Sequence, residues 1–278
     1  MYKRKNSILD VTSTICQLME IKKPKQASTK VFEKVIKQAK KLNIEKIEKV
    51  LVFAPDAVGE FLQKDYSNYF DEVKKYAPIS LKIASVFKPV TPVCFASMFT
   101  GALPTVHGIK KYEKPVIKID TIFDSLIEEN KKTTIVSVKN SSIDLIFRNR
   151  NLDYYSEKYD KEVIEKTIEL LKKDKYDFIL AYNQEYDDSI HDTYPLSEKS
   201  LIALKNQNSN FVKLAKAFNE LYFNYNRAII YTPDHGCHIN ENGFGDHGEN
   251  IKEDMNIIHF WGIFKANEFK TSYGVDTP

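Results

Sequence analysis

The chain has 278 residues, with 41 Lys or Arg against 38 Asp or Glu and a formal net charge of +3. A charge this balanced gives no electrostatic reason to expect a nucleic-acid polymer or a membrane surface as partner. A hydrophobic content of 42% argues against a disordered chain. Three cysteines without a CxxC spacing, together with the absence of a signal-peptide or membrane-span pattern, predict a cytoplasmic protein. The expected organisation is one domain over 1–278.

In chain order, the sequence predicts helices that alternate with short buried strands. Helices are expected at 28–42, 92–100, 121–130, 159–174 and 196–222, the first with a Ser or Thr cap and the last as one helix or two. Strands are expected at 49–54, 80–87, 134–139, 177–182, 227–232 and 257–264. This alternation predicts an α/β fold, a three-layer α/β/α sandwich around a mostly parallel sheet.

Three of these strands run directly into acidic or histidine side chains. In parallel sheets, ligands bind beyond the carboxyl ends of the strands, so these side chains are expected at one edge. Mixed carboxylate and imidazole ligands suit Zn²⁺ or Mn²⁺ better than Mg²⁺ or Ca²⁺. The candidate metal ligands are Asp56, Asp187, His191, Asp234, His235 and His247.

The segment 91–108 places a hydroxyl where a helix is expected to begin. The N-terminal amides of that helix can hold an anion. The hydroxyl of Thr91, beside a divalent cation, can act as an activated nucleophile. A helix N-cap is the alternative role for Thr91.

These motifs resemble, in the same order along the chain, those of the alkaline phosphatase superfamily. The type I phosphodiesterase/nucleotide pyrophosphatase branch is the most similar, and the resemblance covers about residues 49–278. Other relatives are sulfatases, phosphonoacetate hydrolase and cofactor-independent phosphoglycerate mutase. The segment similar to the superfamily's nucleophile region reads Thr91-x8-Thr100-Gly101-x-x-Pro104-x-x-His107-Gly108.

The resemblance implies an alkaline phosphatase-like fold and two divalent cations, with Zn²⁺ expected first and Mn²⁺ as the alternative. Thr91 would attack phosphorus in line and form a phospho-threonine intermediate. The substrate would be a small phosphate ester, a phosphoanhydride or a nucleotide. One cation would be held by Asp56, Thr91, Asp234 and His235, and the other by Asp187, His191 and His247.

Several alternatives remain at this point. The chain could be a phosphomutase or phosphonate hydrolase of the same superfamily, or a non-catalytic protein that binds a metal or phosphate ligand. A threonine at the nucleophile position disfavours a sulfatase. Asp188 could replace Asp187 as a ligand if the register slips by one residue. Structural or supporting roles are expected for His107, His238, Asp246 and His259.

One departure from the family concerns a substrate contact. Diesterase relatives place an Asn four residues after the glycine that corresponds to Gly108, where this chain has Tyr112. Tyr112 and the nearby Lys110 and Lys111 are the candidates to make that contact instead. The departure puts nucleotide pyrophosphatase specificity in doubt without affecting the metal chemistry.

A second departure concerns the chain ends. Relatives continue past the last strand with a segment that residues 7–24 resemble, whereas this chain ends at TSYGVDTP. The hypothesis is a circular permutation, in which part of the helical segment 1–48 replaces the usual C-terminal element and 49–278 forms the catalytic core. Such a permutation should bring the two chain ends close together. An unrelated N-terminal helix is the alternative.

Overall fold

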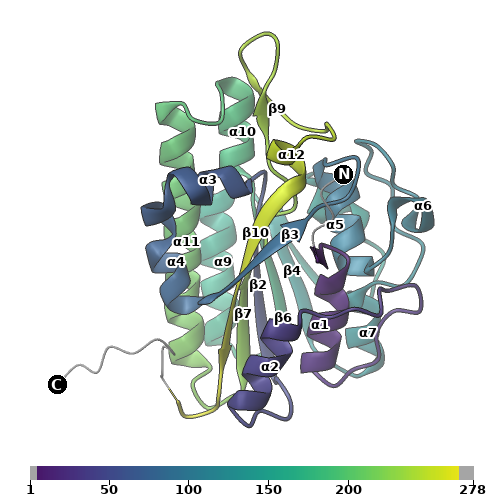
Figure 1. The fold of residues 1–278 in the computed structure, drawn as a ribbon. Helices are drawn as coiled ribbons and strands as arrows, with labels where there is room; N and C mark the ends of the chain where they lie inside the picture. The colour runs from purple at the N-terminus through teal and green to yellow at the C-terminus, as the bar shows by residue number, and fades with distance from the viewer. Residues whose placement is uncertain (1–4, 269–278) are drawn as a thin grey trace, which may run out of the picture.

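An eight-stranded sheet runs through the molecule in the computed structural model, which describes residues 5–268 (Figure 1). Of these eight strands, β10 runs antiparallel to both of its neighbours, and the other pairings are parallel. The mostly parallel sheet is therefore confirmed. The strand order across the sheet is β1 (Asn6–Ser7), β3 (Ile79–Ala84), β10 (Asn256–Phe264), β7 (Arg227–Tyr231), β2 (Lys49–Pro55), β6 (Phe178–Asn183), β4 (Thr133–Val138) and β5 (Asp153–Glu157).

Helices cover both faces of the sheet, because each central strand is apolar on both sides. In β2, Val50 and Val52 join one hydrophobic cluster while Leu51 and Phe53 join the other. Parallel strands buried on both faces read as continuous apolar runs. One layer contains α1 (Asp10–Leu18), α2 (Glu33–Lys41), α5 (Thr91–Thr100), α7 (Ile122–Glu128) and α8 (Ser142–Ile146). The other contains α3 (Glu60–Asp65), α4 (Asp71–Tyr76), α9 (Asp160–Lys172) and α11 (Glu198–Leu221).

Two sequence expectations need correction. The helix expected at 28–42 begins only at Glu33, and its N-cap residue is Phe32. The Ser28 hydroxyl instead donates to Asp10 Oδ1 at 2.9 Å and ties this segment to α1. Strand β5 was not predicted, since its sequence DYYSE is polar and it pairs only with β4 at the sheet edge.

The region expected to contain one helix or two, 196–222, forms the single helix α11 of 24 residues. Despite this length, none of the described helices combines the length and apolar character needed to cross a membrane.

The N-terminal segment packs against the helix that begins at Thr91. Helix α1 is largely buried, and the Thr12 hydroxyl donates to the carbonyl oxygen of Met98 in α5 at 2.7 Å. However, β1 lies beside the carboxyl end of β3, whereas β10 ends next to Arg227 at the amino end of β7 (Figure 1). The first and last described segments therefore lie at opposite ends of the sheet. Residues 269–278 lie outside the described residues, and the permutation stays a hypothesis.

His259 shows how the core accommodates a polar side chain. It lies in β10, is fully buried, and its Nε2–H donates to the carbonyl oxygen of Pro233 at 2.9 Å. Burial lowers the pKa of His259 to about 3. The folded protein thus keeps the ring neutral at pH values where the unfolded chain, with a pKa of about 6.5, takes up a proton.

This difference predicts an acid-linked loss of stability. As the pH falls from about 6.5 toward 3, His259 should lower the free energy of unfolding by about 1.4 kcal/mol per pH unit. The substitution His259→Gln keeps a donor for Pro233 but cannot titrate. In urea titrations between about pH 6 and pH 4, it should reduce the pH slope of stability by about one proton. An unchanged slope would contradict the assignment.

Candidate active site

All seven sequence-predicted site residues meet beyond the carboxyl ends of the parallel strands. Asp56 follows β2, and Asp234 and His235 follow β7. Helix α10 (Glu185–Asp192), which carries Asp187 and His191, begins two residues after β6. Thr91 is the first residue of α5, and His247 follows the short strand β9 (Gly245–Asp246). Neighbouring parallel strands point the same way, so residues far apart in sequence meet at this edge.

The buried cluster consists of Asp56, Asp234 and His235. His235 Nε2 lies 3.4 Å from Asp56 Oδ1 and 3.3 Å from Asp234 Oδ2. The Thr91 hydroxyl donates to Asp56 Oδ2 at 3.3 Å and lies 3.5 Å from His235 Nε2. All four residues are at most 4% exposed. The predicted nucleophile thus sits directly against the predicted ligands of one cation.

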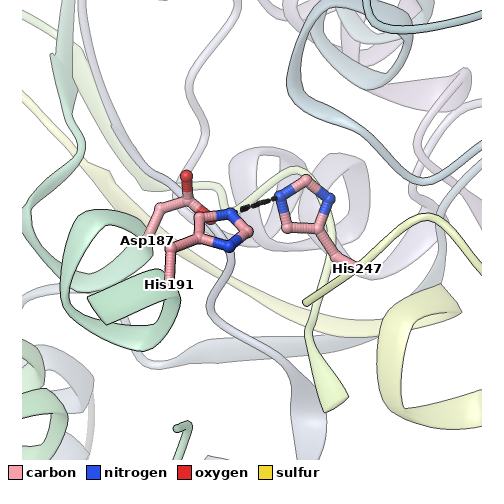
Figure 2. A group of neighbouring side chains, drawn as sticks. All are labelled: Asp187, His191 and His247. Carbon is pink, nitrogen blue, oxygen red and sulfur yellow. Dashed lines mark hydrogen bonds and ion pairs between the residues drawn. The ribbon is translucent and has the colours of Figure 1, made fainter. Parts of the chain in front are cut away.

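The rim cluster consists of Asp187, His191 and His247 (Figure 2). Asp187 Oδ1 lies 3.5 Å from His191 Nε2 and 3.4 Å from His247 Nε2, and the two Nε2 atoms are 3.1 Å apart. The rings of His235 and His247 lie 4.2 Å apart between centroids, so the rim cluster and the buried cluster adjoin.

The three histidines share one orientation. His191, His235 and His247 each direct Nδ1 at a backbone carbonyl oxygen. A carbonyl can only accept, so Nδ1 carries the hydrogen and Nε2 presents its lone pair, as in metal-bound histidines. The acceptors are the carbonyl oxygens of Gly245, Gly236 and Pro89, at 3.1, 2.9 and 3.2 Å.

The unsatisfied atoms of the site fit two divalent cations. Among the described residues, Asp56 Oδ1, Asp187 Oδ1 and Asp234 Oδ2 are buried without a hydrogen-bond partner. These are the same oxygens that face the Nε2 atoms, and an uncompensated buried charge is costly. Within each cluster the possible ligand atoms lie within 4.8 Å of one another. The mixed oxygen and nitrogen donors fit Zn²⁺ or Mn²⁺.

The electrostatics also call for a compensating positive charge. Burial, followed by the charge of Asp187, raises the pKa of Asp56 to about 8. Burial likewise holds the pKa of Asp234 well above its usual range and lowers the pKa of His235 to about 3. Burial opposes ionisation of Asp187, but its interactions with the neighbouring His191 and His247 outweigh burial and hold its pKa low. The buried cluster therefore contains no positively charged side chain that could offset its two carboxylates.

Solved structures of known proteins share this architecture. Murine ectonucleotide pyrophosphatase/phosphodiesterase 5 is 15% identical over 79% of this chain and 90% of that chain, with a TM-score of 0.62. Phosphonoacetate hydrolase from Sinorhizobium meliloti 1021, in complex with phosphonoacetate, is 15% identical over 69% of this chain and 57% of that chain, with a TM-score of 0.53. A 2-O GAG sulfatase is 10% identical over 78% of this chain and 64% of that chain, with a TM-score of 0.55. All three belong to the alkaline phosphatase superfamily.

The chain has an alkaline phosphatase-like fold. The fold expected from the motifs is thereby confirmed. No family model and no curated protein matches the sequence.

Several residues that the sequence analysis missed support the candidate ligands. The Tyr182 hydroxyl, at the end of β6, donates to Asp56 Oδ2. The Asp160 carboxylate accepts the backbone N–H groups of Gln184 and Glu185 at 2.9 and 3.0 Å and so holds the start of α10. Tyr182 ends a predicted strand and Asp160 lies in the first turn of a predicted helix, but neither position by itself indicates such a contact.

Two glycines let backbone segments approach closely beside the site. A Cβ atom on Gly236 would lie 2.0 Å from the carbonyl oxygen of Glu253, and one on Gly245 would lie 2.5 Å from that of Ile190. Neither distance leaves room for a side chain. Glycine at these positions therefore allows the loops of His235 and His247 to pack at the sheet edge.

The residues with expected supporting roles each have a structural partner. Asp188 accepts from Tyr159 Oη at 2.7 Å and belongs to neither cluster. Asp246 Oδ1 accepts the backbone N–H of His247 at 2.8 Å. The remaining pairs are His107 Nε2 with Ser97 Oγ and His238 Nδ1 with Asp254 Oδ1, each at 2.8 Å.

The first turn of α5 offers fewer free amides than the sequence analysis expected. Pro92 has no N–H, and the amides of Val93 and Cys94 both donate to the carbonyl oxygen of Val90 at 3.0 Å. In residues 5–268, the Thr91 amide is the remaining donor of this turn. An anion at Thr91 therefore depends mainly on groups outside the helix.

A polar cavity of about 140 Å³ opens beside Thr91. Asp56 and Asp187 from the two clusters line it, and so does Tyr112. Of the sequence candidates for a substrate contact, Tyr112 is at the cavity, whereas Lys110 and Lys111 are not among the residues that line it.

Proposed function

We propose that the chain is a two-metal hydrolase of phosphate esters or phosphoanhydrides that uses Thr91 as its nucleophile. The observation that carries the proposal is the position of the Thr91 hydroxyl, 3.3 Å from Asp56 Oδ2 and 3.5 Å from His235 Nε2, beside the cavity. A buried hydroxyl next to two clusters of metal-type ligands suits phosphoryl transfer through a covalent intermediate.

The ligand sets follow the two clusters. One cation would be held by Asp56, Thr91, Asp234 and His235, and the other by Asp187, His191 and His247. Zn²⁺ is the first expectation and Mn²⁺ the second, because the ligands mix imidazole with carboxylate. When bound, such cations supply Lewis-acid stabilisation of charge on the phosphoryl oxygens.

The chain's own residues would position and perform the transfer. Asp56 Oδ2 accepts the hydrogen of the Thr91 hydroxyl and thereby orients the oxygen lone pairs. The Tyr182 hydroxyl donates to the same carboxylate oxygen and fixes its direction. Thr91 Oγ1 would then form a bond to phosphorus as the bond from phosphorus to the leaving group breaks, and the leaving group would depart with the proton that the Thr91 hydroxyl gives up. Water would release phosphate from the resulting phospho-threonine in a second step and restore the hydroxyl.

Proteins with the same fold provide support. A threonine-to-alanine variant of murine ectonucleotide pyrophosphatase/phosphodiesterase 5, described as inactive, is found in complex with AMP, with a TM-score of 0.63 to this chain. The phosphonate complexes of the phosphonoacetate hydrolase are a further case of a phosphoryl compound bound by this fold. A small phosphoryl substrate is therefore the expectation for this chain.

A direct assay tests the proposal. Protein loaded with Zn²⁺ or Mn²⁺ should hydrolyse p-nitrophenyl phosphate, bis(p-nitrophenyl) phosphate or both, lose the activity on chelation, and regain it when the metal returns. Phosphosugars and phosphonoacetate in the same panel test the phosphomutase and phosphonate hydrolase alternatives. The absence of turnover for every compound and both metals would contradict a hydrolase and favour a binding protein.

A further inference from the structure

We propose that the cavity beside Thr91 binds a second anionic group of the substrate, carried by the leaving group, between Lys114 and Lys139. This inference rests on the proposed function, in which Thr91 attacks a phosphoryl group held by the two clusters. It adds a substrate class: small phosphate esters whose leaving group carries a compact anion such as a carboxylate.

Two chemically different groups of residues line the same cavity. Thr91, Asp56 and Asp187 belong to the proposed phosphoryl site, and Lys114 and Lys139 are basic. A substrate with its phosphorus at Thr91 would therefore place its leaving group in a cavity that two lysines also line.

Neither lysine is neutralised by the protein. Within residues 5–268, neither Lys114 nor Lys139 has a carboxylate within ion-pairing distance. Lys114 Nζ donates to the carbonyl oxygen of Asn140 at 2.9 Å, which holds it at the cavity. Lys139 directly follows β4, which pairs in parallel with β6. Helix α10, which carries Asp187, begins just after β6. Two unpaired cations at one small cavity favour an anionic occupant.

The third acidic residue of the cavity lining already has hydrogen-bond partners. Asp188 also lines the cavity, but its Oδ2 accepts from Tyr159 Oη at 2.7 Å and from Gln184 Nε2 at 3.1 Å. Asp56 and Asp187 face the proposed cation positions. The lysines are therefore the charged groups available to a leaving group.

The size of the cavity favours a small leaving group over a nucleoside. Its volume of about 140 Å³ lies below the roughly 300 Å³ at which pockets for drug-sized ligands begin. Tyr112 is the exposed aromatic ring at the cavity, and Lys114 Nζ lies 5.5 Å from its centroid. One face of that ring is thus shared with an ammonium group, which leaves less of it for a stacked base.

A matched pair of substrates tests the effect of a negative charge on the leaving group. Phosphoglycolate carries a carboxylate on its leaving group, and phosphoglycolamide carries a neutral amide at the same place. With either one, the P–O bond to Thr91 would form as the P–O bond to the leaving group breaks, and water would then release phosphate. In metal-loaded wild-type protein, kcat/KM should be at least about tenfold higher for phosphoglycolate, as expected for a charge-assisted contact.

Variants assign the effect to the cavity. Lys139→Met should lower kcat/KM for phosphoglycolate at least about tenfold and change the amide value less than about twofold, and Lys114→Met should act in the same direction. Lys118→Met, an exposed lysine that does not line the cavity, is the matched control and should change neither value. In a Thr91→Ala background, calorimetry should show Lys139→Met raising the Kd of phosphoglycolate about tenfold.

The outcomes separate the two proposals. If aryl phosphates are hydrolysed but phosphoglycolate shows no advantage over its amide, or Lys139→Met affects both equally, the anionic subsite is wrong and the hydrolase stands. If no phosphate ester is turned over while phosphoglycolate still binds in a Lys139-dependent way, the hydrolase is wrong and the anion site stands.

Discussion

Replacing Thr91 by alanine should lower kcat at least about 10³-fold on any phosphoryl substrate that the wild-type protein hydrolyses. The substitution removes the hydroxyl oxygen that lies 3.3 Å from Asp56 Oδ2 and 3.5 Å from His235 Nε2. The metal content should stay near that of the wild type, because the carboxylate and imidazole ligands of the buried cluster remain. Steady-state kinetics and elemental analysis of the same preparation measure both quantities.

The control for this substitution lies on the same helix. The Thr100 hydroxyl donates to the carbonyl oxygen of Ala96 at 2.7 Å, a local contact within α5. Thr100→Ala should therefore keep kcat within a few-fold, at a stability cost of about 1 kcal/mol. Thr91→Ser retains a hydroxyl and should keep more activity than Thr91→Ala. If Thr91→Ala keeps kcat within tenfold of wild type, Thr91 is not the nucleophile.

The second large effect is expected at Asp187, whose Oδ1 faces the Nε2 atoms of both rim histidines at 3.5 and 3.4 Å. The metal-loaded wild-type protein should contain about two divalent cations per chain. Asp187→Asn removes the only carboxylate of the rim cluster, so it should lose about one cation and lower kcat/KM at least about 100-fold. Elemental analysis after gel filtration and steady-state kinetics check both expectations.

The neighbouring carboxylate provides a matched control. Asp188 is held by Tyr159 and Gln184 and belongs to neither cluster. Asp188→Asn should keep both cations and most of the activity. Loss of a cation in Asp188→Asn together with retention in Asp187→Asn would reverse the assignment and support the one-residue slip considered in the sequence analysis.

Much of the fold was predictable because buried strands carry a local signal. The run KVLVFAP is apolar on both faces and forms β2, fully buried over Lys49–Pro55. The polar edge strand β5 has no such signal and was missed. The start of α2 was misplaced because Ser28 looks like a cap in sequence but bonds to Asp10, 18 residues away. Local hydrophobic patterns predict which segments are buried, but they do not predict which distant group a polar side chain will contact.

By itself, the sequence determined which residues lie together at the candidate site. Acids and histidines placed just after apolar strands, together with Thr91 at a helix start, predicted that they share one edge of the sheet, and the resemblance to the alkaline phosphatase superfamily implied their division into two sets. This worked because parallel strands deliver their carboxyl ends to one edge, whatever the order of the strands.

Only the tertiary structure decided what surrounds those residues. The Tyr182 hydroxyl reaches Asp56 across 126 positions of sequence, because β2 and β6 pair. Lys139 shares a cavity with Asp187 because β4 pairs with β6. Such contacts depend on strand order and on the direction of individual side chains, which hydrophobic periodicity does not encode. The meeting of the candidate ligands could thus be predicted from sequence, while the groups that orient them and the proposed anion subsite emerged only from the packed sheet.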